Sequence, residues 1–125
     1  MVTWSIRLTD RTYIASVDQL SEGQSLGISI DGRHDQLFIT LHESQIRVWL
    51  NDCPHHHRPL EFRKDQFLST DGTHIVCYAH SAHFDKLEGL CFAGPCKGQY
   101  LTKIPHIEIN GAVYIENNLL TDLRG

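Results

Sequence analysis

Long hydrophobic stretches are missing from this sequence of 125 residues. A membrane-spanning helix needs about 20 mainly apolar residues in a row, and no run of that kind is present. The first residues, Met1 to Arg11, contain neither the apolar segment of a signal peptide nor a twin arginine. We therefore expect a protein that makes no membrane contact and works in the cytoplasm.

An excess of basic residues is missing as well. The chain has 15 Asp and Glu against 11 Lys and Arg, which gives a formal net charge of −4. The acidic and basic residues number 7 and 4 before residue 53 and 8 and 7 after it, so no basic patch or charged tail is present. This balance argues against nucleic acid as a partner.

Repeats, linkers and low-complexity tracts are also absent, and the length suits a single domain over residues 1–125. No segment has a convincing helical period. Short alternating runs separated by turn residues instead predict an all-β domain. The expected strands are residues 13–17, 25–30, 37–42, 46–51, 75–77, 84–87, 103–109 and 112–116.

Two hairpins are the clearest local predictions. Residues 37–42 and 46–51 alternate with a period of two on either side of Glu43-Ser44, so one face of this hairpin is expected to point inward. A second hairpin is expected at Asn110-Gly111, which is the strongest short signal for a tight turn between strands.

Cysteine is scarce, with four residues in the chain. In a reducing compartment such cysteines suggest metal binding before disulfides. Two of them have a histidine close by, in Cys53-Pro54-His55 and in Cys77-Tyr78-Ala79-His80. Each segment offers one thiol and one imidazole, so the two together predict a metal site with four ligands. A Cys₂His₂ zinc clip uses the same ligand set. The other two, Cys91 and Cys96, are interpreted as packing residues in preference to a redox pair.

The residues that follow each pair extend the pattern. The first pair is followed by Pro59-Leu60, and the second by Ser81-Ala82-His83-Phe84-Asp85, Gly89 and Gly94-Pro95-Cys96. With these residues, the stretch 12–117 resembles the Rieske-type 2Fe–2S family. It is most similar to the small soluble Rieske ferredoxins that pass electrons to ring-hydroxylating oxygenases. A zinc clip does not account for the residues beyond the ligands.

The resemblance implies one 2Fe–2S cluster and its four ligands. Cys53 and Cys77 would hold the inner iron, and His55 and His80 would hold the outer iron, which lies nearer to solvent. Neutral imidazoles in place of two thiolates make the oxidised centre neutral instead of dianionic. Such a centre accepts an electron more easily in a medium of low dielectric constant.

The resemblance also implies the Rieske iron–sulfur fold. This fold has an antiparallel β-sandwich or barrel as its base and a small inserted subdomain that binds the cluster. The base would comprise residues 12–52 and 100–117, and the subdomain residues 53–99.

Three features depart from the family pattern. Twenty-one residues separate His55 from Cys77, which predicts an enlarged loop at about residues 61–72. Ser81 stands where the family usually has Gly. His56 and His57 occupy positions that more often hold Arg and Gly.

The function that the resemblance implies is electron transfer, from a reductase to a terminal oxygenase or a similar enzyme, through transient contacts. The alternative is a small subunit of a larger reductase, as in assimilatory nitrite reductases. A catalytic oxygenase is not expected. It would need a mononuclear iron site built from two His and a carboxylate, and only His106 remains after His83.

The sequence further predicts a low reduction potential. Respiratory Rieske proteins carry hydroxyl groups after the second ligand pair that donate hydrogen bonds to cluster or cysteine sulfur. The matching residues here are Ala82 and Phe84, which have no hydroxyl. Because such bonds stabilise the reduced centre, we expect a potential on the order of −150 mV, near the bottom of the Rieske range.

Overall fold

The computed structural model describes residues 11–30, 32, 34–54, 58–79 and 81–119. Within these ranges the chain forms ten strands and one 3₁₀ turn, and residues 117–119 are helical. No helix of this part of the chain is long and apolar enough to cross a membrane. The elements are β1 (Arg11–Ser16), η2 (Val17–Gln19), β2 (Ser25–Ile28), β3 (Leu37–His42), β4 (Gln45–Leu50), β5 (Ile75–Cys77), β6 (Ala82–Phe84), β7 (Cys91–Ala93), β8 (Lys103–Ile104), β9 (Ile107–Ile109) and β10 (Ala112–Glu116).

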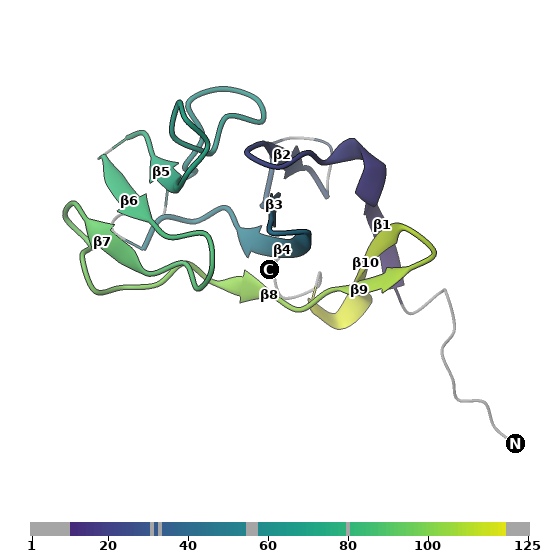
Figure 1. Ribbon diagram of the computed structural model, residues 1–125. Helices are drawn as coiled ribbons and strands as arrows, with labels where there is room; N and C mark the ends of the chain where they lie inside the picture. The colour runs from purple at the N-terminus through teal and green to yellow at the C-terminus, as the bar shows by residue number, and fades with distance from the viewer. Residues whose placement is uncertain (1–10, 31, 33, 55–57, 80, 120–125) are drawn as a thin grey trace, which may run out of the picture.

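The strands make three antiparallel sheets, which confirms the all-β prediction. Their orders are β1-β10-β9, β2-β3-β4-β8 and β5-β6-β7. In Figure 1 the β5-β6-β7 sheet lies at one end of the molecule, the four-stranded sheet in the middle and the β1-β10-β9 sheet at the other end. The first and last strands therefore pair far from the sheet that contains Cys77.

The predicted hairpin at Glu43-Ser44 is confirmed. β3 and β4 pair from Leu37↔Leu50 to His42↔Gln45 without a break. Glu43 and Ser44 both have positive φ, 52° and 65°, as expected for the two-residue turn that best matches the twist of paired strands.

The prediction that this hairpin has one inward face is wrong, because both faces are buried. Ile39 and Val48 pack on one side, and Phe38 and Trp49 pack on the other. Alternation would leave the second face to solvent. Here residues from Cys53 onward pack on this second face and bury it. The alternation within the hairpin cannot predict this burial, because the covering residues lie outside the hairpin.

Two expected strands are placed differently. The expected strand 103–109 is divided into β8 and β9, with Pro105 between them. The strand expected at 84–87 lies earlier, as β6. It stops there because the carboxylate of Asp85 accepts hydrogen bonds from the backbone N–H groups of residues 87, 88 and 90, at 2.7–3.1 Å, and so closes a turn.

Buried side chains form two clusters on either side of the β3–β4 hairpin. We call the first the aromatic core; it contains Phe38, Trp49, Cys53, Leu60, Phe67, Leu68, Ile75, Cys77, Ala82, Phe84, Cys91, Cys96 and Leu101. The second is aliphatic and contains Ala15, Leu20, Ile28, Leu37, Ile39, Ile46, Val48, Ile104, Val113 and Ile115. All four cysteines of the chain belong to the aromatic core.

Candidate functional site

The first ligand loop begins where β4 ends, and its two ends are tied together. The backbone N–H of Cys53 donates to the carbonyl of Arg58 at 2.9 Å, which closes the loop. Asn51 fixes the loop from inside. Its side-chain carbonyl accepts from the N–H of Leu60, and its amide donates to Glu61 Oε1, both at 2.8 Å. Sequence reasoning missed this role of Asn51. The only available signal was a polar residue at the end of a buried strand.

The second ligand loop begins at the end of β5. Cys77 pairs with Ala82 of β6 across the ladder. The N–H of Tyr78 donates to the carbonyl of Leu60 at 3.0 Å, so a backbone hydrogen bond joins the second loop directly to the first. The phenol of Tyr78 donates to the carbonyl of Leu68, so this hydroxyl is not directed at a cysteine sulfur.

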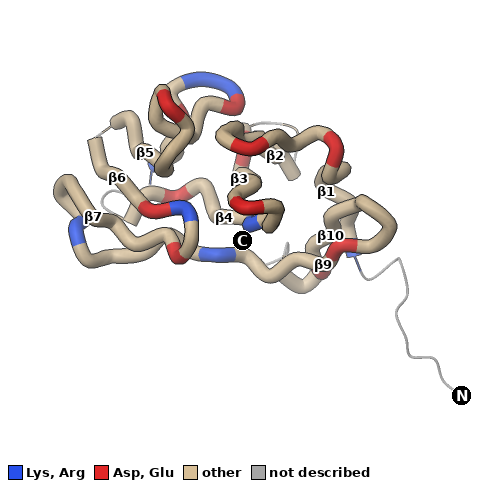
Figure 2. Tube along the Cα trace, viewed as in Figure 1, with Lys and Arg blue, Asp and Glu red and all other residues tan. Residues whose placement is uncertain are grey.

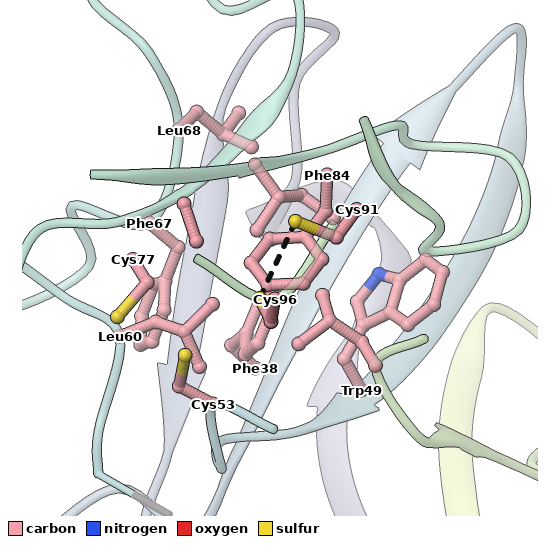
Figure 3. Packing of buried hydrophobic residues seen from close by; sticks show 13 residues of the cluster. Phe38, Trp49, Cys53, Leu60, Phe67, Leu68, Cys77, Phe84, Cys91 and Cys96 are labelled. Carbon is pink, nitrogen blue, oxygen red and sulfur yellow. Dashed lines mark hydrogen bonds between the residues drawn. The ribbon is translucent and has the colours of Figure 1, made fainter. Parts of the chain in front are cut away.

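The two predicted thiol ligands lie in one core. Cys53 and Cys77 are both fully buried in the aromatic core. In Figure 3 their sulfur atoms lie at the same edge of this cluster, beside Leu60. Two buried thiols from two joined loops suit the thiolate half of a Rieske ligand set.

The imidazole half of the predicted set, His55 and His80, falls outside the described residues. Within the described part of the chain, no group of three or more His, Cys, Asp or Glu side chains is arranged to hold a metal ion. Of the four predicted ligands, the described residues include the two cysteines, and these lie in one buried core.

A third loop, residues 93–98, packs against the second ligand loop. Gly94 has φ 105°, and a Cβ atom placed on it would lie 2.7 Å from Ala82 Cα and 2.9 Å from the carbonyl oxygen of Ser81. Only a residue without a side chain allows this approach. The Gly94-Pro95-Cys96 segment thus lies directly beside the chain that leaves Cys77.

The remaining cysteines, Cys91 and Cys96, are adjacent in the aromatic core, with their sulfurs 3.3 Å apart. Cys91 Sγ donates to the carbonyl of Ala93 at 3.1 Å. Burial, followed by the neighbouring sulfur of Cys91 and then that of Cys53, raises the pKa of Cys96 to about 12. All four cysteines lie within the described residues, and none forms a disulfide.

A histidine pair lies beside the β5–β6 ladder. His74 Nε2 and His83 Nδ1 are 2.8 Å apart, and the edge of Phe92, which is 47% exposed, packs against His74. Burial, together with the nearby imidazole of His83, lowers the pKa of His74.

The segment predicted to be an enlarged loop reaches across to β2. The hydroxyl of Ser25 donates to the carbonyl of Asp65 at 2.6 Å, and the N–H of Gly27 donates to Asp65 Oδ1 at 2.7 Å. The loop and the chain around β2 line a cleft of about 930 Å³, with Phe62 and Tyr78 among its walls. Lys64 Nζ donates to the carbonyl of Gly27 at 3.1 Å and so holds the loop to β2 from a second point. Lys64 also forms an ion pair with the buried Asp35 at 3.1 Å.

Charged positions of both signs occur in the part of the chain that the structure describes. In Figure 2 acidic and basic positions are interspersed along the described trace. Two ion pairs, Lys64–Asp35 and Lys103–Glu88, join segments that lie far apart in the sequence.

Comparison with solved structures identifies the fold. The chain matches a ferredoxin of Sphingomonas yanoikuyae B1 with a TM-score of 0.66 and 23% identity, over 85% of this chain and 97% of the ferredoxin. It also matches a chain in a complex of reduced oxygenase and oxidized ferredoxin of carbazole 1,9a-dioxygenase. There the TM-score is 0.65 and the identity 19%, over 86% of this chain and 93% of the matched one.

A third structure shows the same fold inside a larger protein. The terminal oxygenase of carbazole 1,9a-dioxygenase from Nocardioides aromaticivorans IC177 matches with a TM-score of 0.65 and 17% identity. The match covers 85% of this chain but only 29% of the oxygenase. A search of curated protein sequences found no match.

A comparison with protein families assigns the chain to a family. The profile described as "Rieske [2Fe-2S] domain" matches residues 10–109, which is most of the chain. The matched range contains both Cys/His pairs and the three loops described above. The chain therefore belongs to the Rieske [2Fe–2S] domain family, and this membership implies one Rieske 2Fe–2S cluster.

Proposed function

We propose that the protein is a one-electron carrier that receives electrons from a reductase and delivers them to a terminal oxygenase or a similar enzyme. The observation that carries this proposal is the joined pair of loops. Cys53 and Cys77, both fully buried, are brought into one core by a backbone bond from Tyr78 to Leu60.

The ligands that we assign are Cys53, His55, Cys77 and His80. The two thiols, being fully buried, suit the inner iron. The two histidines follow them by two and three residues, which suits an outer iron that a partner's cofactor can approach. When bound, the cluster supplies storage for a single electron.

The surrounding side chains exclude water from the thiol side of this site. Leu60, Phe67 and Phe84 are fully buried in the same core as the two cysteines. Such a setting has a low dielectric constant and penalises added net charge. It therefore suits the neutral oxidised centre that two thiolates and two imidazoles give better than the dianionic centre that four thiolates would give.

We also propose that residues 53–99 form the cluster-binding subdomain, on a base of residues 12–52 and 100–117. The β5-β6-β7 sheet lies wholly within the first range, which supports this division. The aromatic core crosses the boundary, because it includes Phe38 and Trp49 from the base.

The carrier role is supported by the length of the structural matches. The chain covers 97% of a ferredoxin but only 29% of a terminal oxygenase, so the similarity to the oxygenase is confined to one part of that enzyme. A complex of an oxygenase with a ferredoxin of this fold suggests the class of partner. We also propose that the carrier works in the cytoplasm, together with the reductase that supplies its electrons.

The cofactor content tests the proposal. Purified protein should be red-brown and should contain two irons and two acid-labile sulfides per chain, as a 2Fe–2S centre requires. Cys77→Ala should abolish the colour because it removes a ligand, whereas Cys91→Ala should keep it. One zinc without sulfide would refute the proposal, and loss of colour in Cys91→Ala would show that the ligands are wrongly assigned.

A further inference from the structure

We propose that His74 and His83 form a second metal site, which binds one divalent transition-metal ion, such as Zn²⁺, through two imidazole nitrogens. The site is separate from the cluster ligands and does not depend on the proposed function. Two side chains leave coordination positions of the ion open, and water would fill them. The placement of the two rings and the hydrogen bonds that hold them support this assignment.

The histidine pair lies on the outer side of the β5-β6-β7 sheet. Ala82 and Phe84 of β6 both belong to the aromatic core, and His83 stands between them. Successive side chains of a strand point to opposite faces, so His83 points away from that core and meets His74 there. Cys77 pairs with Ala82 and belongs to the aromatic core, so the predicted thiol ligand and the histidine pair lie on opposite faces of the sheet.

The nitrogens that would bind the ion already face each other. His74 Nε2 and His83 Nδ1 are 2.8 Å apart. Two zinc–nitrogen bonds of about 2.0–2.1 Å at a tetrahedral angle would place the nitrogens about 3.3 Å apart. The rings would therefore separate by only about 0.5 Å and turn until both lone pairs meet at the ion. Both residues are partly exposed, so an ion can reach them from solvent.

A chain of hydrogen bonds determines which nitrogen of His74 carries the proton. The carboxylate of Asp71 accepts from the hydroxyl of Thr73 at 2.8 Å. Because that hydroxyl has a single proton, its oxygen is the acceptor toward His74 Nδ1, which lies at 3.0 Å. We therefore assign the proton of the neutral ring to Nδ1, which leaves the lone pair of Nε2 for a ligand. Metal-binding histidines are commonly held through the other ring nitrogen in this way.

Metal binding would replace the hydrogen bond between the two rings. In the structure the lone pair of His74 Nε2 accepts the proton of His83 Nδ1. On binding, that proton would pass through solvent to Nε2 of the same His83 ring, and the freed Nδ1 would bind the ion together with His74 Nε2. No proton is lost from the neutral pair and no electron moves. Burial, followed by the neighbouring His83, lowers the pKa of His74 and favours the neutral ring that binds metal.

The neighbouring residues shape the site. Imidazole nitrogens suit zinc, copper and nickel, whereas magnesium and calcium prefer oxygen ligands. The charge of Asp71 favours a cation beside His74, and that of Lys86 opposes it. The ring of Phe92 packs against His74, with ring centroids 5.4 Å apart, and limits the directions in which the imidazole can turn.

Zinc binding by the purified protein, with its cluster in place, tests the proposal. After dialysis against EDTA, isothermal titration calorimetry with Zn²⁺ measures stoichiometry and affinity. The wild type should bind one zinc ion per chain at this site. His74→Gln and His83→Gln should each weaken that binding by at least about tenfold, because a single imidazole would remain.

Two other histidines provide matched controls. His42 and His106 are also partly buried, and each lies beside a glutamate, at 3.9 Å and 3.7 Å. His42→Gln and His106→Gln should bind zinc as the wild type does. Equal affinity in the wild type, His74→Gln and His83→Gln would overturn the proposal.

Crystals of the wild type soaked in Zn²⁺ give a measurement that does not depend on the folding of a variant. Anomalous difference density at the zinc absorption edge should lie between His74 Nε2 and His83 Nδ1. Crystals without zinc, or with zinc at other residues only, would overturn the proposal. The iron and sulfide content of the protein decides the proposed function separately, because neither is a part of this site.

Discussion

Ser81 lies directly after the second predicted ligand pair and has φ 56°, in the left-handed region that favours glycine. The family usually has Gly at this position, and the backbone angle explains why. A residue with a Cβ atom pays about 1–2 kcal/mol in this conformation. Ser81 thus occupies a backbone conformation that glycine would adopt at lower cost.

Ser81→Gly should therefore stabilise the protein, by up to about 1 kcal/mol, after the greater freedom of Gly in the unfolded chain is subtracted. Urea denaturation followed by circular dichroism measures the change. Ser21→Gly serves as the control, because Ser21 is exposed and is not among the residues with positive φ. Equal stabilisation by both substitutions would contradict the explanation from backbone conformation.

A second prediction at this scale concerns Gly94 and Gly98. Both have positive φ, 105° and 94°, but only Gly94 lies against another segment, because nothing is within 4 Å of a Cβ atom on Gly98. Gly94→Ala should destabilise the protein by about 1–3 kcal/mol more than Gly98→Ala, since overpacking adds to the backbone term. The measurement is the unfolding midpoint in urea. Equal effects would mean that the contact with Ala82 is not tight in solution.

At the scale of the element, short strands at one end of the molecule carry the ligand loops. β5, β6 and β7 have three residues each, and backbone bonds from turns complete their pairing. The histidine pair beside β5 and β6 adds a contact between the two strands that depends on protonation. His74 lies near His83, Asp71 and Lys86, and of these only Asp71 favours its protonated form.

This arrangement predicts how stability depends on pH. The pKa of His74 is lowered in the folded protein, so the unfolded chain binds the proton more readily. The free energy of unfolding should fall as the pH is lowered through about 6.5 and should level off below the folded pKa. His74→Gln should weaken this dependence in urea titrations between about pH 5 and pH 8. A variant with the same pH dependence as the wild type would show that His74 does not contribute.

At the scale of the whole molecule, the three sheets follow one another, so the paired first and last strands, β1 and β10, lie far from the ligand loops. β1 and β10 close the aliphatic core at one end, and the aromatic core at the other contains all four thiols. The proposed carrier would thus hold its ligand loops at the end of the molecule away from β1 and β10. The β3–β4 hairpin connects the two cores, because it packs against both.

The prediction at this scale concerns how the rate of electron transfer from a partner depends on salt. A carrier must dissociate after each transfer, so its interfaces should be small and weak. Given the net charge of −4, the rate of electron transfer from a reductase should change with ionic strength between about 0.05 and 0.5 M. Stopped-flow measurements of cluster reduction would show this. A tight complex that salt does not affect would favour the alternative, a subunit of a larger reductase.

The sequence alone was enough for the fold class, the family, and the hairpins at Glu43-Ser44 and Asn110-Gly111. These features depend on local chemistry: the period of alternation, the turn residues, and motif residues at short spacing. The expected base and subdomain, and the ligand set with His55 and His80, remain predictions. The loop at residues 61–72 was expected from spacing, but its attachment to β2 was not.

Only the tertiary structure showed which segments distant in the sequence pack against one another. The burial of Phe38 and Trp49 depends on a segment that follows the hairpin, and an alternating pattern cannot indicate that such a segment will cover its second face. The approach of Gly94 to Ala82 joins residues from two separate loops. Neither residue has a pattern of its own that indicates the other, because the contact is created by packing of the third loop on the second.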